Sequence, residues 1–217
     1  MIHEVDDAVR QILRAEALPG TKVEIALDAP TKDWAARRNA PTVNMYLYDI
    51  REDLRRRQRG LLNEYSPDGR VAARHLPPRY LKMSYLITAW TQRPEDEHRL
   101  LSALAVTLLR YDALPPRLLT GSLAALGLPV PMTVALPPPE DRAFADVWTA
   151  LGGELKPSLD LVVSAPVDAG RSYPAEKPAE DGARLDVDGD GRVGHRPHPD
   201  ASASANGRLA MTRVRES

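Results

Sequence analysis

The sequence contains no cysteine, which excludes disulfide bonds, thiolate metal sites and cysteine nucleophiles and suits a reducing compartment. Aromatic residues are scarce as well, at 5% of the 217 residues, and phenylalanine occurs once. Hydrophobic residues still make up 43%, close to the share of an ordinary globular protein, so the chain can form a core. We therefore expect a core filled mainly by aliphatic side chains.

Charge of one sign is not in excess, because 29 Lys and Arg residues face 30 Asp and Glu residues, for a net charge of -1. A protein whose main work is binding nucleic acid carries a bulk positive field, which this balance excludes. The sequence also lacks the ~18 uninterrupted apolar residues of a membrane helix, and its first seven residues include three acids and no apolar run. We expect neither a secretory signal nor a membrane-spanning segment.

Catalytic signatures are missing as well. The sequence has no G-x-S-x-G elbow, no GxxxxGK[ST] phosphate loop and no HExxH pair. His98 falls in the acidic first turn of a predicted helix, where a solvated or ion-paired side chain is expected. His3 and His75 have no carboxylate and nucleophile pattern around them. We therefore predict that the protein is not an enzyme and needs no cofactor.

Hydrophobic periodicity over the first 167 residues alternates between helix and strand. It predicts a helix from Ile2 that ends before Pro19, strands over 23–27, 42–50 and 80–90, a helix from Pro94 with a stripe from Leu100 to Leu109, an edge or bulged strand over 130–136, a helix over 140–150 and a last strand over 155–167. This order predicts an α+β fold with a mixed, largely antiparallel sheet and packed helices. Alternation in the two longest strands predicts a sheet with one buried face.

Composition changes near residue 168. Between Asp168 and Ser217 only seven of fifty residues are large and apolar, too few to offset the conformational entropy of the chain. We predict an α/β domain over residues 1–167 and a Pro- and Gly-rich C-terminal arm of low hydrophobicity over residues 168–217. The arm either orders on a partner or stays a solvated tail.

A short acidic stretch in this arm copies the first half of an EF-hand loop. Asp186, Asp188 and Asp190 fall at loop positions one, three and five, followed by the expected glycine. Position twelve should be a bidentate glutamate, and here it is Pro197. Two interpretations follow: a calcium site that makes this chain a calcium-responsive binding module, or an acidic, Gly-rich loop.

A run of five arginines within nine residues follows the predicted strand over 42–50 and includes Arg51, Arg55, Arg56 and Arg57. Phosphate contact by a nucleic-acid adaptor is one interpretation, although no aromatic residues are interleaved. An acidic surface on a neighbouring subunit is another, because arginine is favoured at interfaces for its bidentate pairing. A solvated charged turn is the third.

Three blocks of this sequence, in this order, resemble one known family. They are Ile2 to Asp6, the strand Thr42 to Glu52, and Leu86 to Trp90 followed by Pro94 to Leu101. The family is the tail-terminator, or cap, protein of phage-tail-like contractile injection systems of the antifeeding-prophage and virulence-cassette kind. The resemblance spans residues 1–165 and leaves the arm uncovered.

The resemblance implies a structural protein that forms a homo-hexameric ring on the end of an inner tube and its sheath. The ring stops polymerisation and anchors the last sheath layer. The implied partners are copies of the chain itself, the sheath protein and the inner tube protein, without membrane or nucleic acid, and the implied place of assembly is the cytoplasm. We expect the turn carrying Asp49, Arg51, Glu52 and residues 55–57 to contact the tube or a neighbouring subunit.

Overall fold

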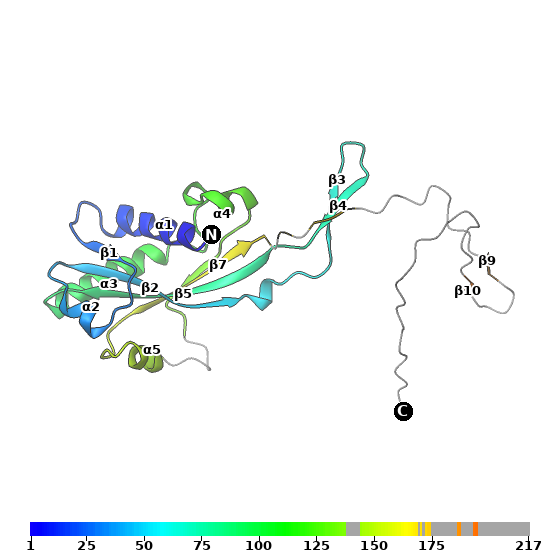
Figure 1. Ribbon diagram of the computed structural model, residues 1–217. Coiled ribbons are helices and arrows are strands. Elements are labelled where there is room, and N and C mark those ends of the chain that lie inside the picture. The colour runs from blue at the N-terminus through cyan, green and yellow to red at the C-terminus, as the bar shows by residue number, and fades with distance from the viewer. Residues whose placement is uncertain (138–143, 169, 171, 175–185, 188–192, 195–217) are drawn as a thin grey trace, which may run out of the picture. The chain divides into compact units, whose positions relative to one another are not determined.

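The computed structural model describes residues 1–137, 144–168, 170, 172–174, 186–187 and 193–194. The chain divides into two compact units, Met1–Ala175 and Glu176–Ser217. The first unit is built on a five-stranded sheet with helices on its faces (Figure 1). In the second unit, β9 (Asp186–Val187) pairs antiparallel with β10 (Val193–Gly194). Among the described residues, no helix combines the length and the apolar character needed to cross a membrane.

The central sheet has the strand order β1-β2-β5-β7-β6. The two longest strands, β2 (Thr42–Glu52) and β5 (Arg79–Trp90), pair antiparallel in its middle. β7 (Leu159–Val167) and β6 (Met132–Val134) continue the antiparallel pairing on one side, and β1 (Glu24–Ala26) pairs in parallel with β2 on the other. The mixed, largely antiparallel sheet predicted from sequence is confirmed, and β6 is an edge strand as expected.

Three helices lie on one face of this sheet: α1 (Ile2–Ile12), α3 (Pro94–Leu108) and α4 (Gly121–Leu126) (Figure 1). They bury a continuous aliphatic core against the odd-numbered residues of β5. The core includes Val5, Val9, Ile12, Met83, Tyr85, Ile87, Leu104, Leu108 and Leu123. α3 begins at Pro94 as predicted, but Leu109 was wrongly placed in its apolar stripe. Leu109 follows the last helical residue and is 63% exposed.

The opposite face of the sheet is covered too, so the prediction of a single buried face was wrong. Leu86 and Thr88 are buried although they alternate with the core residues of β5. Trp34 of α2 (Lys32–Ala36) packs edge-to-face on Trp90, with ring centroids 5.4 Å apart. Figure 1 shows α5 (Phe144–Ala150) on this side of the sheet, away from α1. The sequence analysis missed α2.

A second, smaller sheet projects from the central one (Figure 1). Its strands are β3 (Leu62–Tyr65), β4 (Val71–His75) and β8 (Ser172–Pro174), in the antiparallel order β3-β4-β8. A tight turn joins β3 to β4, in which Gly69 has a φ of 80° and donates its amide to Ser66. The sequence analysis did not find this hairpin. β8 belongs to the first unit, which ends at Ala175. The domain boundary expected after residue 167 remains a prediction.

Candidate assembly interface

The arginine-rich turn lies between the end of β2 and the projecting hairpin. β2 carries an irregularity between Leu47 and Asp49 and then continues to pair with β5 as far as Glu52. The backbone amide of Asp53 donates to the carbonyl oxygen of Tyr80 at 2.7 Å, and a single 3-10 turn, Leu54–Arg56, follows. The backbone of the turn is therefore fixed to the central sheet at its start.

Arg56 pairs with a buried carboxylate at the start of this turn. Its Nε atom lies 3.5 Å from Oδ2 of Asp53, a carboxylate that is 6% exposed. The same Oδ2 accepts a hydrogen bond of 2.9 Å from the hydroxyl of Ser164 in β7. The guanidinium of Arg56 also lies 5.6 Å from the ring centroid of Tyr80. Removing Arg56 would leave a buried carboxylate with one partner fewer, so Arg56 contributes to the stability of the turn. Its place in an interface remains a prediction.

Other predicted interface residues pair with each other. Asp49 and Arg51 form an ion pair of 3.1 Å. Glu52 binds Arg79 of β5 and lies 3.7 Å from the Nε atom of Arg57. The charges of these side chains are partly neutralised within the chain. Less unpaired charge is therefore available to a partner than the sequence indicated.

Arg55 and Arg59 are exposed members of the run that form no ion pair with any residue that the structure describes. Nearby, Arg57 and Arg59 line a small cleft of about 360 Å³ with Arg79 and Pro77. The available positive charge of the turn therefore lies at Arg55 and around this cleft. This arrangement suits a carboxylate of a neighbouring protein.

Large apolar side chains are exposed on the same stretch of chain. They are Ile50 in β2, Leu54 in the turn, Leu61, and Leu62 and Tyr65 in β3, with exposed fractions of 44% to 65%. Exposed large apolar residues close to charged ones are typical of protein interfaces. We call these residues together with Arg55 and Arg59 the hairpin-base surface. The sequence analysis found its arginines but missed its apolar part.

The acidic stretch of the arm lies mostly beyond the described residues. Asp186 begins β9, whereas Asp188 and Asp190 fall outside the described part of the chain. Within that part, no group of three or more histidine, aspartate or glutamate side chains is arranged to hold a metal ion. The calcium interpretation of the 186–197 stretch remains a prediction.

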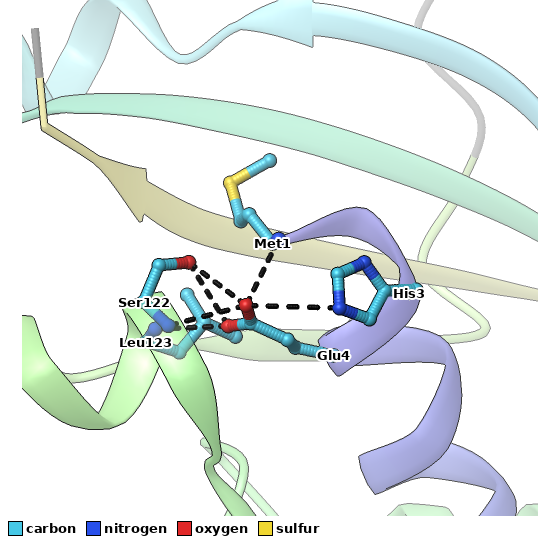
Figure 2. A network of polar contacts seen from close by, with 5 residues as sticks. All are labelled: Met1, His3, Glu4, Ser122 and Leu123. Atoms are coloured by element: carbon cyan, nitrogen blue, oxygen red, sulfur yellow. Dashed lines mark hydrogen bonds and ion pairs between the residues drawn. The ribbon is translucent and has the colours of Figure 1, made fainter.

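Glu4 forms a buried polar contact that fixes α1 to α4 (Figure 2). Its carboxylate accepts hydrogen bonds from the backbone amides of Ser122 and Leu123 and from the Ser122 hydroxyl, at 2.9 to 3.1 Å. The α-amino group of Met1 also donates to it at 3.1 Å. Burial raises the pKa of Glu4, but these hydrogen bonds favour the ionised form more strongly and lower the pKa to about 2.

This contact joins residues more than a hundred positions apart, and no local sequence signal could have revealed it. The Glu4 side chain is buried, and both of its oxygens accept hydrogen bonds from groups of α4. The Glu4 contact therefore organises the fold, and the exposed hairpin-base surface is the better candidate for a functional site.

Comparison with known proteins adds to this picture. No curated protein sequence matches the chain. Among solved structures, the sheath/tube terminator of PVC, an extracellular contractile injection system, in its extended state matches with a TM-score of 0.59 and 23% identity, over 86% of this chain and 66% of that one. The tube-terminating cap of the anti-feeding prophage matches with a TM-score of 0.55 and 23% identity, over 83% of this chain and 59% of that one.

Both comparisons establish the fold, and they confirm the fold expected from the resemblance to tail terminators. The chain spans 66% and 59% of the two solved proteins, so it accounts for only part of their length. A sequence model of the Pvc16 N-terminal domain family matches residues 4–180, which is most of the chain. The chain therefore belongs to the Pvc16 N-terminal domain family.

Proposed function

We propose that this chain is a structural cap that terminates the inner tube and sheath of a contractile injection system. The observation that carries this proposal is the fold shared with a sheath/tube terminator and a tube-terminating cap over more than four fifths of the chain. The family match over residues 4–180 supports it independently. A structural role also agrees with the hairpin-base surface, which combines exposed apolar side chains with arginines.

In this proposal, copies of the chain assemble into a closed ring through the hairpin-base surface. Exposed Leu54 and Leu62 supply apolar area, and Arg55 supplies an unneutralised cation for an acidic patch on the next subunit. A head-to-tail contact of this kind closes into a ring when the rotation between subunits divides the circle. Six copies, as the resemblance implies, would match a six-fold tube.

The ring would stop tube polymerisation and anchor the last sheath layer. We place its assembly in the cytoplasm, before or as the particle is completed. The C-terminal arm, residues 168–217, would reach sheath subunits and add main-chain hydrogen bonds to an exposed strand. Such an arm would strengthen sheath attachment without being required for ring closure.

The decisive experiment images sheath and tube particles by negative stain after assembly with and without this protein. The expected result is a defined length, with a ring at one end, only when the protein is present. Identical length distributions in the two preparations would refute the proposal.

A matched pair of variants tests the surface. Leu62→Ser combined with Arg55→Ser should abolish rings while leaving the purified chain folded. Arg37→Ser, which removes another exposed arginine at the end of α2, should leave rings intact. Rings that form equally well in both variants would exclude the hairpin-base surface as the subunit contact. The salt dependence of ring formation should weaken when Arg55 is replaced.

A further inference from the structure

A cleft of about 680 Å³ lies at the end of the central sheet where β2 begins and β5 ends. One wall is the segment 38–41, which connects α2 to β2, and the other runs from Trp90 into the first turns of α3. Val23 and Leu100 add apolar lining. The hairpin-base surface follows the opposite end of β2, so this cleft is a separate feature of the same unit.

The lining of the cleft is cationic, with Arg38, Arg93 and Arg99 against a single carboxylate, Asp96. Two of these arginines have weak partners. Arg93 lies 3.6 Å from Glu95 and is 72% exposed, and Arg99 lies 2.9 Å from Asp96 and is 78% exposed. Exposed ion pairs of this kind contribute little net free energy. Both guanidinium groups are therefore free to pair with a ligand carboxylate at small cost.

Arg38 is held more firmly and has a hydrogen-bonding capacity that the fold does not use. Its guanidinium lies 4.6 Å from the ring centroid of Trp34, and its Nη1 atom lies 3.4 Å from a carboxylate oxygen of Glu24. Its Nε atom is buried and finds no hydrogen-bond acceptor among the described residues. The side chain as a whole is 30% exposed and lines the cleft, so a carboxylate there can pair with the guanidinium, whose hydrogen-bonding capacity the fold leaves partly unused.

The chemistry of the cleft favours a peptide over a nucleic acid. Single-stranded nucleic acid binds by stacking bases on exposed aromatic rings. Trp90, the aromatic residue of the lining, already has the ammonium of Lys156 4.2 Å from its ring centroid and the ring of Trp34 against it. The apolar side chains of Val23 and Leu100 instead suit an aliphatic side chain between two acidic ones.

We propose that this cleft binds a short acidic segment of a partner protein. Carboxylates of the segment pair with Arg38 and with Arg93 or Arg99, and an aliphatic side chain between them packs on Val23 and Leu100. The proposal concerns a second contact surface and stands apart from the cap function and from the hairpin-base surface.

The test uses an array of twelve-residue peptides of varied composition probed with the purified full chain. We expect the bound set to be enriched in peptides that alternate carboxylates with aliphatic residues, with binding that falls as salt rises. The variant R38Q/R93Q/R99Q should bind this set at least about tenfold more weakly, since the lost charge-assisted pairs together contribute on the order of one decade or more. The control R110Q/R117Q removes two exposed arginines that line neither this cleft nor the hairpin-base surface, and it should bind like the wild type.

A second variant guards against misfolding, because Arg38 packs on Trp34. R93Q/R99Q changes two exposed side chains, should keep the thermal unfolding curve of the wild type, and should still weaken peptide binding severalfold. A bound set without acidic enrichment, or one that the variants bind equally well, would overturn the proposal. Binding of a single-stranded RNA homopolymer in preference to the peptides would overturn it as well.

Discussion

The Oε2 atom of Glu4, near the start of α1, lies 2.9 Å from the backbone nitrogen of Leu123 in α4. The same carboxylate meets the amide of Ser122, so one side chain satisfies two of the amides that a helix start leaves without partners. Thr120, the residue before α4, makes no side-chain cap of its own. α4 is therefore capped from another helix, and the position of α4 depends on α1.

Replacing this acid should destabilise the protein. Glu4→Gln keeps one acceptor but directs an NH₂ group at backbone amides, which are donors themselves. We expect the free energy of unfolding at pH 7 to fall by about 2–3 kcal/mol. Urea denaturation followed by tryptophan fluorescence measures it. Glu95→Gln, at an exposed position in the first turn of α3, is the control and should cost under about 0.5 kcal/mol. Equal costs for both variants would contradict the prediction.

The lowered pKa of Glu4 gives this stabilisation a definite pH dependence. The pKa lies at about 2 in the folded chain, against an ordinary glutamate value of 4.5 that applies once the chain unfolds and these contacts are lost. Because the unfolded chain binds the proton first, the contribution of Glu4 is complete above about pH 4.5 and is lost as the pH falls toward 2. The stability difference between wild type and Glu4→Gln should therefore shrink over that window. A difference that stays constant from about pH 7 to about pH 2.5 would show that the ionised form carries no special stabilisation.

Position 121 requires glycine for two reasons: its backbone conformation and the close approach of Glu4. Its φ is 49°, and a Cβ atom there would lie 2.6 Å from Oε1 of Glu4. Gly127, at the other end of α4, has a φ of 60° and open space around it. Gly127→Ala should therefore cost about 1 kcal/mol from backbone strain alone. Gly121→Ala should cost clearly more, because the Glu4 carboxylate has to move.

A double-mutant cycle separates the two causes. In a Glu4→Ala background the clash is gone, so Gly121→Ala should cost no more than Gly127→Ala. Chemical denaturation of the four variants gives the coupling energy. If Gly121→Ala costs the same with and without Glu4, the close approach of the two residues does not matter for stability.

Elements with a long periodic pattern of hydrophobic residues could be predicted from the sequence. α1, α3, β2 and β5 were all predicted, because eleven or more residues each repeat the spacing of a buried face. α2 has five residues, too few for periodicity to show, and its cue was Thr31, whose hydroxyl accepts from the amide of Trp34 at 3.2 Å. The residues of β3 are all exposed, so the hairpin shows no hydrophobic alternation. Its one local signal was the turn sequence from Ser66 to Gly69.

The candidate site, too, could be predicted from the sequence only in part. The arginine run is visible in the sequence. The sequence does not show that Arg56 has an ion-pair partner within the chain while Arg55 has none. Arg56 serves Asp53, whose other partner, Ser164, is 111 residues away in β7. Contacts of that range depend on strand order, which periodicity does not determine. The exposed apolar side chains of the hairpin base likewise become a surface only when the strands are placed.

β8 lies close to the end of the first unit. Ser172, Tyr173 and Pro174 pair with β4, which lies between β8 and β3 in the small sheet. A chain cut after residue 175 keeps this pairing, whereas a chain cut after residue 167 loses it. A two-stranded hairpin is marginally stable on its own. We therefore expect the shorter chain to open at β3 and β4 while the central sheet keeps its stability.

Hydrogen exchange measures this directly. Amides of residues 71–75 should exchange at least about tenfold faster in the chain 1–167 than in the chain 1–175, because local opening of the hairpin becomes easier. Amides of β5, in the middle of the central sheet, should exchange equally in both and act as the internal control. Equal protection of residues 71–75 in the two chains would mean that β8 does not stabilise the hairpin. In that case residues 168–175 would contribute no stability to the first unit and would belong to the arm.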